Sequence, residues 1–260
     1  MDKIQGGVGF FDSGIGGLTV LAECKKHIHD QVFYYYGDNA HAPYGNLPER
    51  VIEKYVFSAF DTFAELKVES AVIACNTATA VCVEKLRKTY PFPIIGAEPA
   101  LLPAVKEKGD VFVLTTRATY ESLRFQNLCD RARKKYPLAN VTAFPCDNLA
   151  GEIERNLFTP NYDYTPFLPK GNPTHVVLGC THYIYLKSQI ARFYNCKVID
   201  GNEGIAKRLK YFLDDISVKN RNSRPLSTTT LDSPANSAPV FFIGGQKNTN
   251  EHVFEQMFAK

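Results

Sequence analysis

Two cysteines stand at matching places in the sequence, each directly after a short apolar run. Cys75 lies in AVIACNTATA (71–80) and Cys180 lies in HVVLGCTHYI (175–184). A cysteine at the end of a strand is ordinarily a small buried hydrophobe, but a matched pair with polar residues directly behind it favours chemistry. Two thiols that face each other across a cleft can remove a proton from one face of a carbon and deliver one to the other face.

The other cysteines lack this pattern, and we expect them to be structural: Cys24, Cys82, Cys129, Cys146 and Cys196. His182 follows Cys180 by two residues, so it can act as a base for that thiol, as in nucleophilic catalysis, or support it from behind. No CxxC, HExxH or second Cys/His cluster supplies further metal ligands. We therefore expect no metal ion.

A glycine-rich turn, Asp12-Ser13-Gly14-Ile15-Gly16-Gly17, follows the first apolar run. It matches neither GxGxxG nor a Walker loop. Its backbone amides and the Ser13 hydroxyl are suited to a small carboxylate rather than a dinucleotide. A second turn, Pro43-Tyr44-Gly45, comes soon after another apolar run.

These residues need strands and helices to position them. Short β-branched or aromatic runs alternate with longer amphipathic stretches, which predicts an α/β fold with mostly parallel sheets covered by helices. The expected strands are Val8–Phe11, Val32–Tyr36, Ala71–Ala74, Ile94–Ile95, Val111–Leu114, Val141–Phe144, His175–Leu178, Lys197–Ile199 and Val240–Ile243. The expected helices are 48–66, 77–90, 119–136, 184–194 and 203–213. In open parallel sheets, ligands bind beyond the carboxyl ends of the strands, which is where the polar residues collect.

The pattern also repeats along the chain. The surroundings of Cys75, Asp12 and Asp38 recur about 105 positions later, which predicts a duplicated half-chain with two pseudo-symmetric domains. We expect residues 1–95 plus 205–260 to form the first domain, which carries Cys75. Residues 96–204 form the second, with Cys180, and the active site lies in the cleft between them. Residues 217–239 are rich in Ser, Thr, Asn and Pro and predict a surface loop.

Composition excludes several classes of protein. Of 260 residues, 45% are hydrophobic and 22% charged, with a formal net charge of +3, which is typical of a globular domain and too weak a charge to predict nucleic-acid or membrane binding. No apolar run reaches the length of a bilayer span, and the sequence starts without a signal-type apolar segment. The seven cysteines form no paired spacing, so we expect a cytoplasmic protein with reduced thiols.

Taken together, the motifs resemble those of a known family. FDSGIGG, GDNAHAPYG, ACNTAT, GAEPA, TTRAT and LGCTHY occur in this order between residues 8 and 205. The chain is similar to the cofactor-independent glutamate racemases of the aspartate/glutamate racemase superfamily. The resemblance implies interconversion of L- and D-glutamate by two cysteine thiols without a cofactor, a role in supplying D-glutamate for peptidoglycan, and a homodimer.

The resemblance also implies roles for individual residues. Cys75 would act on the D-enantiomer and Cys180 on the L-enantiomer, with Asp12 assisting the first thiol, and His182 with Glu152 assisting the second. The match at Glu152 rests on a segment that departs from the family pattern, and Glu154 competes for the role. The residues expected to hold the substrate are Ser13, Pro43, Tyr44, Gly45, Asn76, Thr77, Thr116, Thr119 and Thr181. The chain also departs from the family near its last strand, where it has Gly244-Gly245-Gln246.

Three alternatives remain open at this point. The same chemistry could act on aspartate or a related amino acid. A Cys-His hydrolase would use Cys180 and His182, but it leaves Cys75 and the duplication without a role. A non-catalytic amino-acid-binding protein would keep the fold and would not exchange the α-proton.

Overall fold

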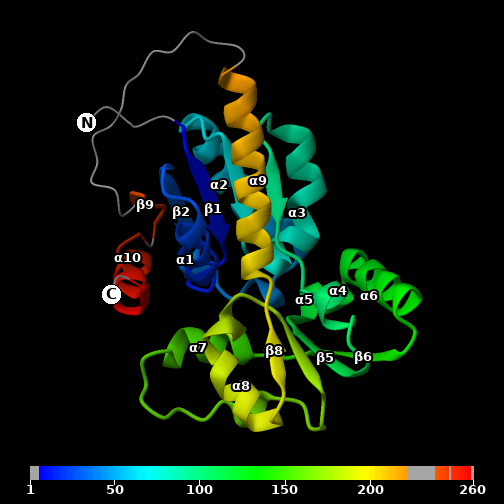
Figure 1. Cartoon of the computed structure of the whole chain (residues 1–260). Helices are drawn as coiled ribbons and strands as arrows, with labels where there is room; N and C mark the ends of the chain where they lie inside the picture. The colour runs from blue at the N-terminus through cyan, green and yellow to red at the C-terminus, as the bar shows by residue number, and fades with distance from the viewer. Residues whose placement is uncertain (1–5, 222–237, 246, 259–260) are drawn as a thin grey trace.

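The computed structural model describes residues 6–221, 238–245 and 247–258, with side chains of 216–221 excepted. Strands and helices alternate along it (Figure 1). The strands are β1 (Val8–Asp12), β2 (Phe33–Gly37), β3 (Ser70–Ile73), β4 (Ile94–Gly96), β5 (Gly109–Thr115), β6 (Ala139–Pro145), β7 (His175–Gly179), β8 (Lys197–Ile199) and β9 (Val240–Ile243). The α-helices are α1 (Leu18–His27), α2 (Glu49–Glu65), α3 (Asn76–Thr89), α4 (Leu101–Ala104), α5 (Arg117–Glu121), α6 (Leu123–Lys135), α7 (Leu149–Asn156), α8 (Lys187–Tyr194), α9 (Asn202–Arg221) and α10 (Lys247–Phe258). Short 3-10 helices lie at η1 (Asn39–His41), η2 (Tyr44–Asn46), η3 (Thr165–Phe167) and η4 (His182–Leu186).

The strands form two parallel sheets, which confirms the α/β prediction. The first has the order β4-β3-β1-β2-β9 and the second the order β6-β5-β7-β8. Each predicted strand is present, with ends within two residues of the expected ones. The central strands β1, β3 and β7 are buried along their whole length, which explains why they read as continuous apolar runs rather than alternating ones.

The two sheets share one topology. β1 pairs with β2 and β3, and β3 pairs with β4. In the second sheet, β5 pairs with β6 and β7, and β7 pairs with β8. The order β4-β3-β1-β2 thus corresponds strand for strand to β8-β7-β5-β6, as expected for a duplicated half-chain. We use the terms first half and second half for the parts of the chain that carry the first and the second sheet.

Helices cover both faces of the first sheet and define its two cores. α2 buries one stripe of its surface, Ile52, Val56, Ala59, Phe60 and Phe63, against β1 and β3. On the other face, α1 and α9 pack together over Phe10 and Val72. The chain passes into the second half after β4 and returns where β8 leads into α9 (Figure 1). The division at residues 95/96 and 204/205 stays a prediction, although it falls close to these crossings.

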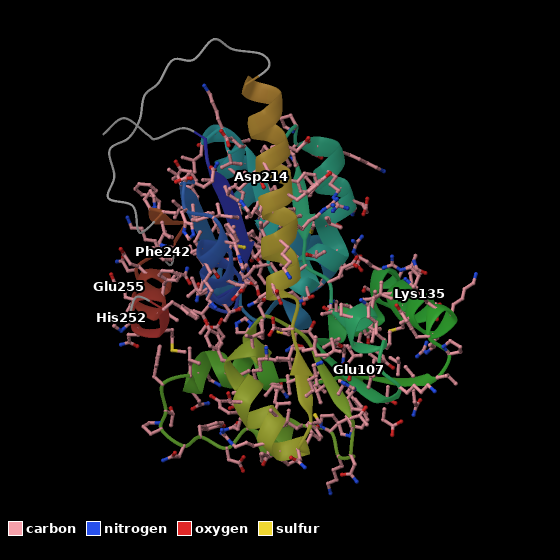
Figure 2. The ribbon with its side chains drawn as sticks, viewed as in Figure 1. Glu107, Lys135, Asp214, Phe242, His252 and Glu255 are labelled. Atoms are coloured by element: carbon pink, nitrogen blue, oxygen red, sulfur yellow. The ribbon has the colours of Figure 1, made fainter. Side chains whose placement is uncertain are left out.

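The last elements close the edge of the first sheet. β9 pairs with β2 in parallel, and Phe242 packs against the rings of Tyr35 and Phe254. α10 is amphipathic: Val253 and Phe254 are buried, whereas His252 and Glu255 point outward (Figure 2). The C-terminal segment therefore belongs with the first half.

The structure corrects three expected elements. The helix expected over 119–136 is two helices, because Ser122 is extended (φ −67°, ψ 137°) and its hydroxyl caps α6 by accepting from the Phe125 amide. The helix expected over 184–194 begins as the 3-10 helix η4 before α8. The helix expected over 203–213 continues to Arg221, so residues 217–221 of the predicted polar loop are helical. Most of that loop, residues 222–237, lies outside the described residues, as does Gln246.

In the part of the chain that the structure describes, no helix combines the length and the apolar character that crossing a bilayer requires.

Candidate active site

The carboxyl ends of four central strands meet at the junction of the two halves. β1 ends in Asp12, and Cys75 comes shortly after β3. In the second half, Thr116 follows β5 and Cys180 follows β7. These side chains are all buried. Because the two sheets have the same topology, each half contributes one cysteine from the equivalent strand.

Cys75 lies at the N-terminus of α3. Its sulfur accepts a hydrogen bond from the Ala78 amide (3.4 Å), and its thiol donates to the Ser13 hydroxyl (3.5 Å). The helix end favours a thiolate, but burial and the neighbouring Asp12 carboxylate outweigh it and raise the pKa of Cys75 to about 12. The thiol of Cys75 therefore keeps its proton at neutral pH.

Asp12 is buried beside Cys75. Its carboxylate accepts from the Gly14 amide (3.0 Å) and, from the second half, from the Thr181 hydroxyl (3.1 Å). Burial raises the pKa of Asp12 from its usual 3.8 to about 6, against the opposing effects of His182 and these hydrogen bonds. Asp12 therefore titrates close to the pH range in which enzymes work.

Cys180, His182 and Glu154 form a hydrogen-bonded series of side chains in the second half, which we call the acid-base chain. The Cys180 sulfur lies 3.8 Å from Nδ1 of His182, and Nε2 of His182 lies 2.6 Å from Oε1 of Glu154. Burial alone would lower the pKa of His182, but the Glu154 carboxylate and Cys180 raise it well above its usual range. Unlike Cys75, Cys180 precedes a 3-10 helix and caps no α-helix.

The carboxylate that contacts His182 belongs to Glu154 and not to Glu152. Glu152 contacts Tyr162, Arg155 and Asn156 instead. Both residues belong to α7, and two positions along an α-helix turn a side chain by about 200°. Only one of them can face His182, and the packing of Leu149 and Ile153 in the core of the second half decides which.

Three buried threonine hydroxyls from the two halves form a cluster at the junction. Thr77 Oγ1 lies 2.8 Å from Thr116 Oγ1 and 3.4 Å from Thr119 Oγ1, and Thr116 donates to Thr119 (3.0 Å). Thr77 is the second residue of α3 in the first half, whereas the other two belong to the second half. Nearby, Oδ1 of Asn76 has no hydrogen-bond partner among the described residues. The cluster and Asn76 can offer donors to a carboxylate.

The turn at Pro43-Tyr44-Gly45 closes one side of this region. Tyr44 is buried and donates to Asp38 Oδ2 (2.6 Å). Gly45 packs on Thr116, and a β-carbon there would approach Thr116 Cβ to 2.8 Å. A narrow cavity between the halves is lined by Pro43, Gly45 and Thr116, among others.

The glycine-rich turn after β1 touches the second half directly. A β-carbon on Gly14 would lie 2.0 Å from Glu154 Oε1, and one on Gly16 would lie 2.4 Å from Thr181 Oγ1. These glycines permit the close approach of the two halves. Two phenols that sequence reasoning missed also hold this turn: Tyr35 donates to Gly14 O (2.7 Å) and Tyr185 to Ile15 O (2.8 Å). Tyr185 lies five positions after Cys180, which is the only signal that could have found it.

Among the residues that the structure describes, no group of three or more His, Cys, Asp or Glu side chains is arranged to hold a metal ion.

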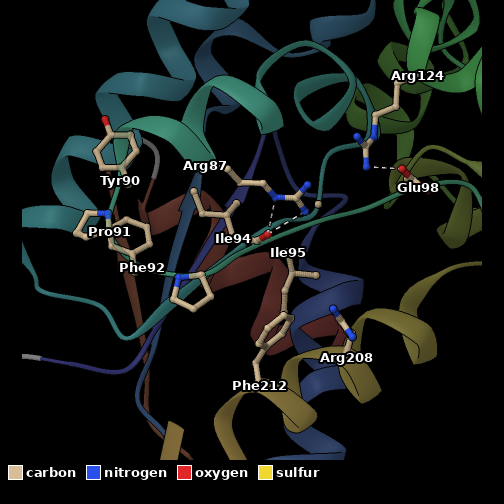
Figure 3. A pocket seen from close by; sticks show the side chains of 12 residues that line it. Arg87, Tyr90, Pro91, Phe92, Ile94, Ile95, Glu98, Arg124, Arg208 and Phe212 are labelled. Carbon is tan, nitrogen blue, oxygen red and sulfur yellow. Dashed lines mark hydrogen bonds and ion pairs between the residues drawn. The ribbon is translucent and has the colours of Figure 1, made fainter. Parts of the chain in front are cut away.

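A larger cavity of about 660 Å³ lies beside β4, outside the site described above (Figure 3). Arg87 donates there to Ile94 O (3.1 Å), Arg124 pairs with Glu98, and Arg208 lies over the Phe212 ring. None of the predicted site residues lines it.

Comparison with known proteins decides the family. The model of the Asp/Glu/Hydantoin racemase family matches residues 19–209. The chain belongs to this racemase family. Among curated relatives of this racemase, a glutamate racemase of Clostridium kluyveri is 36% identical over 236 residues, covering 86% of this chain and 90% of the relative. A glutamate racemase of Clostridium botulinum is 34% identical over 87% of this chain and 91% of its own length.

Solved structures resemble this racemase along nearly its whole length. Escherichia coli glutamate racemase, in complex with L-glutamate and the activator UDP-MurNAc-Ala, has a TM-score of 0.77 at 25% identity and covers 97% of this chain and 95% of its own. Glutamate racemase from Francisella tularensis, in complex with D-glutamate, has a TM-score of 0.73 at 25% identity and covers 100% and 96%. The family inferred from the sequence motifs and the two-sheet fold are thus confirmed. The roles of individual site residues stay predictions.

Proposed function

We propose that this protein interconverts L- and D-glutamate by a two-base mechanism that uses Cys75 and Cys180 and no cofactor. The observation that carries the proposal is the pair of buried cysteines on equivalent strands of the two halves, each with its own acid-base neighbours. Asp12 lies beside Cys75, and the His182–Glu154 pair lies behind Cys180. The names of the relatives support glutamate as the substrate.

In the L-to-D direction, the sulfur of Cys180 takes the α-proton and becomes a thiol. The thiol of Cys75 gives its proton to the opposite face of the carbanion and becomes a thiolate. The raised pKa of Cys75 suits this donor role, and the positive charge that His182 carries when protonated stabilises the thiolate needed at Cys180. The D-to-L direction reverses both transfers, so each thiol works on one face.

The α-proton of an amino acid is a very weak acid, so the site must stabilise the carbanion with fixed donors and exclude water. The threonine cluster (Thr77, Thr116 and Thr119), with Asn76, supplies donors for one substrate carboxylate. Ser13 and the backbone amides of Tyr44 and Gly45 are assigned to the other. Near-attack geometry requires each sulfur about 3–4 Å from the α-carbon.

We also propose, from the resemblance to the family, that the protein is a cytoplasmic homodimer and that it supplies D-glutamate for peptidoglycan synthesis.

Hydrogen–deuterium exchange tests the proposal. In D₂O, the purified protein should racemise both L- and D-glutamate, as followed by circular dichroism, and should place deuterium at the α-carbon, as followed by NMR. Chelators and carbonyl-trapping reagents should leave the rate unchanged. Turnover of aspartate instead of glutamate would reassign the substrate, and enantiomers that stay intact would overturn the proposal.

A hydrolase that used Cys180 as nucleophile, with His182 and Glu154 behind it, is a second candidate because the three groups form one hydrogen-bonded chain. It requires a covalent acyl intermediate on Cys180. Intact-mass spectrometry of the protein after mixing with glutamine or glutamate esters distinguishes the two functions. If the protein is a racemase, its intact mass should stay unmodified.

A further inference from the structure

One residue of the glycine-rich turn, Ile15, is held on both sides by the second half. The amide of Ile15 donates to Glu154 Oε1 (3.2 Å), and its carbonyl accepts from the Tyr185 hydroxyl (2.8 Å). Glu154 already belongs to the proposed acid-base chain, whereas Tyr185 lies outside it. We propose that Tyr185 is a positioning residue that clamps the turn of the first half (Asp12–Gly17) onto the second half and so stabilises the closed site.

The ring of Tyr185 is placed to act between the halves. It packs against the core of the first half that contains Phe10 and Leu18, and also against the core of the second half that contains Leu186 and Ile190. Burial, together with Asp12 and Glu154, raises the pKa of Tyr185 well above its usual range. The phenol therefore keeps its proton and remains a donor to Ile15 O at all working pH values.

The clamp fixes the turn that carries Asp12 and Ser13 relative to the side chains of the second half. The same turn carries Asp12 and Ser13, which contact the Thr181 hydroxyl and the Cys75 thiol. Tyr35 holds the neighbouring carbonyl, Gly14 O, from within the first half. Tyr35 therefore shapes the turn, whereas Tyr185 ties it to the other half.

Removal of the Tyr185 hydroxyl isolates this effect. Ile15 O also accepts from the Leu18 amide (3.1 Å), so Tyr185→Phe leaves no orphaned carbonyl. The loss then destabilises the closed arrangement alone by the net contribution of one hydrogen bond, which lowers the ratio of closed to open molecules about three- to tenfold.

The matched control is Tyr194→Phe. Tyr194, in α8, also donates a half-buried phenol hydrogen bond to a backbone carbonyl, that of Pro169, but both partners lie within the second half. Both variants lose the same group, so a difference between them reports on the junction rather than on general stability.

Thiol alkylation of the free enzyme is the primary test. With iodoacetamide and peptide mass spectrometry, Tyr185→Phe should raise the alkylation rates of Cys75 and Cys180 about three- to tenfold over those in Tyr194→Phe. The core thiols Cys24 and Cys82 are fully buried, and their rates should be equal in the two variants. Equal rates at all four thiols, or a uniform rise at all four, would overturn the proposal.

A second arm rests on the proposed racemisation. A three- to tenfold rise in alkylation requires a free enzyme that is mostly closed, so the closed fraction itself falls only slightly. Because the apparent dissociation constant rises only in proportion to the loss of that fraction, Tyr185→Phe should raise KM for glutamate by no more than about twofold and leave kcat nearly unchanged. A fall in kcat without faster alkylation would contradict the clamp. If the parent enzyme does not turn over glutamate but the alkylation difference appears, the proposed function fails and the clamp stands.

Discussion

Oε1 of Glu154 lies 2.6 Å from Nε2 of His182, and the other nitrogen of the same ring faces the Cys180 sulfur at 3.8 Å. The carboxylate also accepts from the Ile15 amide of the first half. Glu154 thus joins the acid-base chain behind Cys180 to the turn that carries Asp12. A change at Glu154 should disturb both the charge on His182 and the contact between the halves.

Removal of either thiol tests the two-base scheme. Cys75→Ala and Cys180→Ala should each lower kcat/KM for glutamate on the order of a thousandfold or more, because a face of the α-carbon loses its acid and base. Cys82→Ala is the control, since Cys82 is buried in the apolar core of the first half and its thiol forms no hydrogen bond with a described site residue. Racemisation rates in both directions provide the measurement. Full activity in either single mutant would sink the scheme.

A pair of isosteric changes separates the two glutamates of α7. Glu154→Gln should lower kcat about a hundredfold, because His182 loses the charge that keeps its pKa raised. Glu152→Gln should leave kcat within about twofold, because Glu152 pairs with the exposed Arg155, whereas His182 pairs with Glu154. Steady-state kinetics on the two variants decides between them. The reverse order would restore Glu152 to the role that the sequence resemblance implied.

The raised pKa of Asp12 predicts an acid limb in the rate. Below about pH 6 the carboxyl is protonated and can no longer accept a proton from the Cys75 thiol, so kcat/KM should fall as the pH drops through this value. Asp12→Asn should be far less active and should lack this limb. The pH profile of kcat/KM in both proteins is the measurement, and an unchanged limb in the variant would assign it to another group.

The raised pKa of Asp12 also makes the free energy of unfolding depend on pH. Because the folded protein binds the proton more tightly than the unfolded chain does, the folded state gains from protonation, and the free energy of unfolding should decrease as the pH rises from about 4 to 6. The contribution is on the order of 3 kcal/mol. Urea unfolding of the parent and of Asp12→Ala across this range should show the variant gaining relative stability as the pH rises. A constant difference would contradict the burial argument.

The close contact at Gly16 makes a further prediction. In Gly16→Ala, the new methyl group would lie 2.4 Å from Thr181 Oγ1 and 2.8 Å from His182 Nδ1, so the halves cannot approach and activity should fall at least tenfold. Gly204→Ala is the matched control. A β-carbon there meets nothing within 4 Å, and Gly204 is in α9, so this variant should keep activity and gain about 0.5–1 kcal/mol. Thermal unfolding and kinetics of both variants are compared. Normal activity in Gly16→Ala would show that the close contact is not needed for turnover.

Much of the scaffold could be predicted from the sequence because its signals are local. Apolar runs such as VGFFD (8–12) must lie inside a sheet, and polar residues directly after them must lie at its edge. The helix break at Ser122 was missed because a serine in an amphipathic stretch reads as one exposed position, and only its cap hydrogen bond to Phe125 shows the new start.

The sequence by itself predicted which residues could react, because Cys75 and Cys180 follow matching apolar runs, and the repeated order of motifs already indicated two similar halves. Only the tertiary structure decided how they are paired and charged. The rotation of α7 turned Glu154 toward His182, burial outweighed the helix end at Cys75, and Tyr185 met Ile15 across the junction. These outcomes depend on contacts between segments far apart in the chain, and their energies are set by burial, which no local pattern encodes.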